Sequence, residues 1–190
     1  MICFYFFQIE IVRAIVPYYY FPTIKNLQKQ SLYIGKNAYQ LLYFGQYEDS
    51  LNLAKLAVKI NAKDEKLWLI LAEAQIANKE YKNALNSLNK AEQINSSISE
   101  IYFAKSNVYL KISQQKKAKS ALEKGIKIEP NNHKAIFQLG NIFLMEKNYL
   151  EAINLFEKSI KIKTDFWQAI NNKGLAYFEK KQSESRNQTF

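Results

Sequence analysis

Residues 133–166 read HKAIFQLGNIFLMEKNYLEAINLFEKSIKIKTDF, and this stretch decides the fold. From Ile136 to Phe143 its apolar residues recur three or four positions apart, which is the spacing of one helical face. The same spacing returns from Ala152 to Ile160, after a short polar turn at 146–148. The stretch therefore predicts two amphipathic helices joined by a tight turn.

The pattern recurs every 34 residues along positions 31–190. Small residues mark the period in three columns of one register: Ala38, Ala72, Ser106, Gly140 and Gly174; Ser50, Ala84, Ala118 and Ala152; Ala57, Ala91, Gly125 and Ser159. Small side chains let two antiparallel helices approach closely, while larger residues fill the space around them. The sequence predicts a row of helical hairpins, with units 31–64, 65–98, 99–132 and 133–166 and a partial unit 167–181.

The repeat resembles the tetratricopeptide repeat (TPR) family, whose pattern is W-x2-L-G-x2-Y, then A-x3-F, then P, on a 34-residue period. Unit 133–166 carries Ile136-x2-Leu139-Gly140-x2-Phe143 and then Ala152-x3-Phe156. The resemblance implies an all-α, right-handed superhelical solenoid of helix-turn-helix hairpins, with about four full repeats plus a partial fifth. It also implies a generic protein-binding scaffold.

In this family the first helix of every unit lines a concave groove. The matching positions give the expected partner-binding groove of this chain: Leu69, Glu73, Ile76, Phe103, Asn107, Leu110, Lys134, Phe137, Asn141, Leu144, Asn171 and Phe178. Phe103 and Phe137 lie one period apart and are predicted to stand side by side as anchors for an apolar segment of a partner. The alternative is that these groove residues pack against neighbouring helices of the same chain, or against residues 1–30.

Chaperone-binding members of the family hold a C-terminal carboxylate with several Lys and Asn residues on consecutive units. In each register of this chain at most one position matches, Lys134 or Asn107, so a carboxylate-clamp chaperone tail is not an expected partner.

Nothing in the sequence predicts catalysis, and no enzyme, cofactor or metal site is expected. A Gly-rich phosphate loop and a nucleophile elbow are missing from the sequence. One cysteine, Cys3, and one histidine, His133, cannot form a Cys/His zinc site. His133 opens a predicted helix, where an exposed surface position is expected.

The net charge of +10 is concentrated in residues 99–132, where seven lysines face three glutamates. Nucleic-acid readers rely on arginine, and the chain has only Arg13 and Arg186. The Lys105–Lys127 region is therefore interpreted as a solvated surface, and nucleic-acid binding there is the weaker alternative.

The N-terminal leader, residues 1–30, holds eight aromatic residues in its first 22 positions. Glu10 and Arg13 interrupt its apolar run too early for a membrane-spanning helix. Three interpretations stay open: a hydrophobic cap on the repeats, a degenerate or truncated signal peptide, and an aromatic anchor through residues 1–22 on a membrane surface. The expected location is cytoplasmic or peripheral to a membrane, or exported if residues 1–16 are a truncated signal.

The expected function is a non-catalytic protein-protein interaction scaffold that binds a peptide or helix of another protein in the groove. The alternative is a membrane-associated assembly factor or co-chaperone-like adaptor, similar to TPR proteins that assist photosystem assembly. Residues 182–190 are expected to form a polar tail after the partial fifth unit; the other interpretation is that the chain is a shortened form of a longer array.

Overall fold

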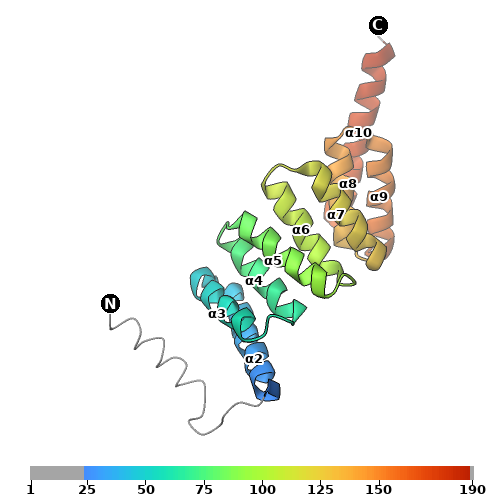
Figure 1. The fold of residues 1–190 in the computed structure, drawn as a ribbon. Helices are drawn as coiled ribbons and strands as arrows, with labels where there is room; N and C mark the ends of the chain where they lie inside the picture. Colours follow the sequence, from blue (N-terminus) through green and yellow to red (C-terminus); the bar gives the residue numbers. More distant parts are fainter. Residues whose placement is uncertain (1–23, 189–190) are drawn as a thin grey trace.

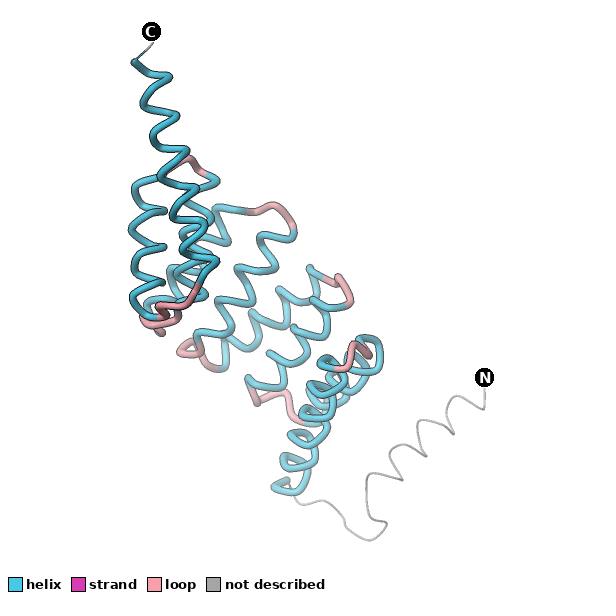
Figure 2. Tube along the Cα trace, turned by 180° about the vertical axis from the view of Figure 1, so that it is seen from behind, coloured by secondary structure: helices cyan, strands magenta, loops and turns pink. Residues whose placement is uncertain are grey.

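The computed structural model describes residues 24–188, and within that range all secondary structure is helical (Figure 1). The helices, labelled as in Figure 1, are α2 (Ile24–Tyr43), α3 (Tyr47–Ile60), α4 (Glu65–Ala77), α5 (Tyr81–Ile94), α6 (Ser99–Lys111), α7 (Gln115–Ile128), α8 (His133–Met145), α9 (Tyr149–Ile162) and α10 (Trp167–Gln188). They pair as four hairpins, α2–α3 to α8–α9, with α10 packed on α9. Figure 2 shows the same stack from behind, with short turns between the helices. The predicted solenoid of hairpins is confirmed.

Small residues sit where the two helices of a hairpin cross, as the sequence predicts. Ala38, Ala72 and Ser106 are fully buried in the first helices of three hairpins. In the fourth hairpin, a Cβ on Gly140 would lie only 2.7 Å from the ring of Phe156 in the facing helix. The large apolar residues around these crossings form the core; the most deeply buried are Leu67, Leu88, Ile101, Leu122, Ile136 and Phe156.

A left-handed residue closes the first helix of every hairpin. The positive φ angles fall at Gly45 (77°), Lys79 (61°), Ser113 (58°) and Lys147 (60°), each one period after the last. The amide of the next residue donates back across the helix end, as from Asn148 to the Phe143 carbonyl at 2.9 Å. This is the Schellman arrangement, which satisfies carbonyls that the helix leaves without a partner. The repeated turn therefore fixes one hairpin geometry in all four units.

The first helices of the hairpins form one side of the stack. α2 contacts α4, α4 contacts α6, and α8 contacts α10, whereas no two consecutive second helices within residues 24–188 pack as closely. A stack that is more crowded along one side curves toward that side. By this argument the first helices lie on the inner side of the curve, and whether a groove there binds a partner stays a prediction.

The ends of the array differ from the predicted boundaries. α2 begins at Ile24, so the boundary expected at residue 31 falls inside a helix, and residues 1–23 of the leader lie outside the described residues. α10 continues to Gln188, through most of the segment expected to be a polar tail. It does so because no Gly or Pro follows Gly174 before the helix ends and because Lys180 pairs with Glu184 one turn later, at 3.6 Å.

Among residues 24–188, none of the helices combines the length and the apolar character that a membrane span needs.

Candidate partner-binding surface

The inner surface of the array is carried by α4, α6, α8 and α10. A direct bond between two of these helices shows how closely they lie: the Asn172 amide nitrogen donates to the Asn141 side-chain oxygen at 2.7 Å. Asn141 is one of the predicted groove residues, and it is half-buried by this contact. Side chains of α8 and α10 therefore meet on this surface.

Five of the predicted groove residues are exposed on this surface. Asn107 and Leu110 belong to α6, Lys134 to α8, and Asn171 and Phe178 to α10. The ring of Phe178 is 61% exposed, and neighbouring Leu175 is 48% exposed. Apolar groups this open to water are available to a partner, and the amides of Asn107 and Asn171 can each donate and accept a hydrogen bond.

Phe103 and Phe137 are engaged within their own chain. The ring of Phe103 covers Gly125 in α7, where an added Cβ would lie 2.4 Å from it. The ring centroid of Phe137 lies 5.7 Å from that of Phe156 and 5.1 Å from that of Phe166. Within residues 24–188 no ring contact joins Phe103 to Phe137, so the expected side-by-side pair does not form. These contacts favour the alternative in which the two rings pack against neighbouring helices.

The remaining predicted residues of the surface are half-buried. Leu69 and Ile76 of α4 pack against the core of the second hairpin, and Leu144 of α8 packs against that of the fourth. The side chain of Glu73, also in α4, has a raised pKa, because burial disfavours its charged form and because Glu100 of α6 adds a second negative charge. Glu73 and Glu100 thus place two carboxyl groups on adjacent first helices.

The lysine-rich region forms contacts that the sequence analysis did not predict. Lys105 is buried and donates to the Glu92 carboxylate. Burial raises the pKa of Glu92, but the hydrogen bond and charge of Lys105, aided by Tyr102 and Lys124, outweigh it and lower the pKa below its ordinary value. These residues line a pocket of about 170 Å³ between α5, α6 and α7. Positions 92 and 105 belong to different units, so the pair has no signal in the spacing of a single repeat.

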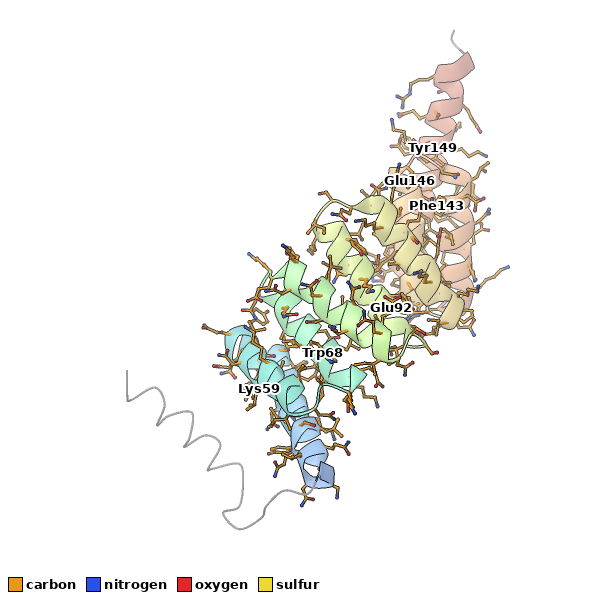
Figure 3. All side chains as sticks on the ribbon, viewed as in Figure 1. Lys59, Trp68, Glu92, Phe143, Glu146 and Tyr149 are labelled. Atoms are coloured by element: carbon orange, nitrogen blue, oxygen red, sulfur yellow. The ribbon has the colours of Figure 1, made fainter. Side chains whose placement is uncertain are left out.

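A second lysine of this region joins the third hairpin to the fourth. Lys119 of α7 donates to Glu146 at 2.9 Å, and its Nζ lies 3.7 Å from the centroid of the Phe143 ring. Figure 3 labels Phe143 of α8 and Glu146, which directly follows that helix. Lys117 and Lys124 lie 5.7 and 5.8 Å from the rings of Tyr109 and Tyr102. Much of the basic segment is thus used in contacts between helices.

His133 is half-buried, and the expectation of an exposed surface histidine is wrong. Its ring packs edge-to-face on Phe166, with centroids 5.0 Å apart, because the loop after α9 brings Phe166 over the start of α8. Among residues 24–188, nowhere do three or more His, Cys, Asp or Glu side chains gather in a way that could hold a metal ion.

Comparisons with known proteins agree with this architecture. The tetratricopeptide repeat family model matches residues 99–132 and 133–166, which are two of the predicted units. No curated protein matches the chain. The crystal structure of MamA is 22% identical, with a TM-score of 0.72, covering 85% of this chain and 86% of MamA.

Two further solved structures have the same fold. YrrB, described as a TPR protein with an unusual peptide-binding site, is 20% identical, with a TM-score of 0.65, covering 78% of this chain and 76% of YrrB. The first TPR of Spaghetti (RPAP3), solved with the HSP90 peptide SRMEEVD, is 19% identical, with a TM-score of 0.60, covering 62% of this chain and 94% of that chain. The repeat motif, the stacked hairpins and the family match agree: residues 99–166 match the tetratricopeptide repeat family, and the chain has the fold of the TPR structures it resembles.

Proposed function

We propose that this protein is a non-catalytic scaffold that binds an apolar segment of a partner protein along the inner surface of its first helices. The observation that carries the proposal is the set of exposed apolar and amide side chains on α6 and α10. Leu110, Leu175 and Phe178 are at least one-third exposed, and Asn107 and Asn171 lie beside them. Covering such side chains removes apolar area from water, which favours association.

The charges of the surface define the partner further. Glu73 and Glu100 lie toward one end of it, and the raised pKa of Glu73 reflects burial and the nearby Glu100 charge. A lysine or arginine of the partner would relieve this repulsion. We therefore propose a segment with apolar side chains against α6 and α10 and a basic residue against α4.

The neighbouring structures support a peptide as the kind of partner, because two of their titles record a peptide site or a bound peptide. The proposed segment lies within a chain and is not a C-terminal tail, since the Lys and Asn set that grips a terminal carboxylate is not matched here. The membrane-associated alternative depends on residues 1–22, which lie outside the described residues. Nucleic-acid binding is less favoured, because Lys105 and Lys119 are held by Glu92 and Glu146.

Selection of peptides from a random library on the full-length protein tests the proposal. We expect the selected peptides to share apolar residues and at least one Lys or Arg. Titration should then give an affinity weakened about tenfold by Phe178→Ala and by Asn107→Ala, with little change in the melting temperature. Leu150→Ala is the matched control, since Leu150 is equally exposed but belongs to the second helix α9. Equal binding by all the variants would show that the inner surface is not the site.

A further inference from the structure

A buried ion pair lies at one junction of the array, where the neighbouring junctions hold apolar side chains. Between the second hairpin and the third, Glu92 of α5, labelled in Figure 3, meets Lys105 of α6. At the junctions one period earlier and one period later, the same two positions hold apolar residues of the core or packed against it: Val58 and Leu71, and Ile126 and Leu139. The packing of one hairpin on the next therefore does not require charges at this place.

The ion pair also gains the fold little over an apolar pair. The side chain of Lys105 is only 8% exposed. Removing two charges from water costs free energy that their attraction offsets only in part, so apolar residues in the same place are often as stabilising. Among residues 24–188 the ammonium group of Lys105 has one acceptor, Glu92, which leaves it with spare N–H donors. Because Lys105 lines the pocket of about 170 Å³ between α5, α6 and α7, those donors are available to a molecule bound there.

Two more lysines line this pocket from one face of α7. Lys117 and Lys124 lie two helical turns apart, and their Nζ atoms are 5.7 and 5.8 Å from the ring centroids of Tyr109 and Tyr102. Neither lysine takes part in an ion pair within residues 24–188. With these two lysines and Lys105 against a single glutamate, the lining of the pocket has an excess of two positive charges.

The charge of the pocket is particular to this unit. At the position of Lys117 the other full units carry acidic or amide side chains: Asp49, Asn83 and Glu151. A lysine there, together with the buried Lys105, is found only in unit 99–132. The repeat thus supplies its own comparison, in which the same hairpin forms without these cations.

We propose that the pocket binds a phosphate monoester, either a free small molecule or a phosphorylated side chain of a peptide, through Lys105, Lys117 and Lys124. A phosphate monoester carries about 1.5–2 negative charges near pH 7 and has acceptor oxygens to spare, which matches two excess positive charges and a wall of N–H donors. A carboxylate, or one phosphate of a nucleic-acid backbone, brings a single charge. The site uses the face of α6 away from Asn107 and Leu110, so it is separate from the proposed partner-binding surface.

Calorimetric titration of the full-length protein at constant ionic strength tests the proposal with two probes. These are inorganic phosphate and a short Gly/Ala peptide that contains one phosphoserine. We expect both to bind, with affinities weakened at least about tenfold by Lys117→Gln or Lys124→Gln. Both side chains are exposed, so the variants should melt like the parent chain. Lys116→Gln is the matched control, because it removes the same charge from the next position of α7, outside the pocket.

The order of the two affinities identifies the source of the phosphate group. Tighter binding of the phosphopeptide assigns the pocket to a phosphorylated protein segment, and tighter binding of inorganic phosphate assigns it to a small phosphate. Equal losses in Lys116→Gln and Lys117→Gln would overturn the proposal, since general positive charge would then explain the binding. It would also be overturned by equal binding of the unphosphorylated peptide or of acetate, or by an oligonucleotide without a terminal phosphate that binds the pocket as tightly.

The neighbouring junctions supply a further variant that keeps the net charge. Glu92→Val together with Lys105→Leu reproduces the pair Val58 and Leu71. We expect this double variant to melt at or above the temperature of the parent chain and to bind phosphate at least about tenfold more weakly. Unchanged phosphate affinity in the folded double variant would contradict the proposal. Phe178→Ala should leave phosphate binding intact, so failure of this site and failure of the partner-binding surface are distinguishable.

Discussion

The ring of Phe156 in α9 lies so close to Gly140 in α8 that an added Cβ would approach it to 2.7 Å. Phe156 is fully buried, so its ring has little room to move aside. Gly174 occupies the same position one period later and has no such neighbour within 4 Å. One position of the repeat thus offers two opposite environments for the same substitution.

Gly140→Ala should lower the free energy of unfolding by about 1–3 kcal/mol, because the added methyl overpacks the crossing by more than the gain in helix propensity. Gly174→Ala should raise it by up to about 1 kcal/mol, since alanine is a better helix former than glycine and nothing crowds it. Chemical denaturation at low protein concentration measures both values. Equal effects at the two positions would show that the Gly140 crossing is not tightly packed.

The turn residues give a second prediction. Lys147→Gly should stabilise the protein by about 0.5–1 kcal/mol, because glycine adopts a φ of 60° without the steric cost that lysine has there. Gly45→Ala should destabilise it by about 1 kcal/mol, since Gly45 has a φ of 77°. Melting temperatures report both changes, and Lys163→Gly, outside the left-handed positions, serves as the control. A stabilisation by Lys163→Gly equal to that of Lys147→Gly would contradict this reasoning.

The ion pairs Lys105–Glu92 and Lys119–Glu146 should contribute differently to the stability of the fold. Lys105→Ala should destabilise by about 1–3 kcal/mol, because it leaves the half-buried Glu92 without its charged donor. Lys119→Ala should cost about 0–1 kcal/mol, since both partners of that pair are more open to water. Folding lowers the pKa of Glu92 below its ordinary value of 4.5. The ion pair with Lys105 therefore stabilises the protein fully at pH values above 4.5, and this stabilisation is lost as the pH falls through the pKa of Glu92 in the folded state. Denaturation curves between neutral and acid pH should show the effect of Lys105→Ala shrinking in acid.

Glu73 should show the opposite pH dependence. Burial and Glu100 raise its pKa, so its charged form destabilises the folded protein at neutral pH. Glu73→Gln should therefore raise the melting temperature at pH 7, and the difference should disappear below the ordinary value of 4.5, where the carboxyl is protonated in both states. Glu65→Gln, at the start of the same helix, is the control. A Glu73→Gln variant that gains the same stability at every pH would show that charge is not the cause.

Alanine substitutions of the aromatic residues on the inner surface distinguish rings that pack in the fold from rings that are free to bind a partner. Phe103→Ala and Phe137→Ala should each lower stability by about 1–3 kcal/mol, since Phe103 covers Gly125 and Phe137 packs on Phe156 and Phe166. Phe178→Ala removes a ring that is 61% exposed and should change stability by less than about 0.5 kcal/mol. Thermal denaturation followed by circular dichroism measures all three. If Phe103→Ala melts like the parent chain, its ring is free for a partner after all.

The sequence by itself determined the helices, their pairing into hairpins and the places where the chain turns. Each of these features depends on apolar spacing and side-chain volume within one unit, and the period repeats them, so Gly140 and Ala152 predict the same crossing as their counterparts in other units. The groove positions on the first helices came from the family resemblance and stay a prediction.

Only the tertiary structure decided how residues of different elements meet. The rings of Phe103 and Phe137 turn toward neighbouring helices because the hairpin crossing brings Gly125 and Phe156 within reach. Lys105 meets Glu92 across two units, and the start of α2 and the extension of α10 likewise differ from the boundaries expected from the period. The contacts between units depend on the angle at which one unit stacks on the next, and that angle is set by many side chains together, so the spacing within a single repeat does not encode it.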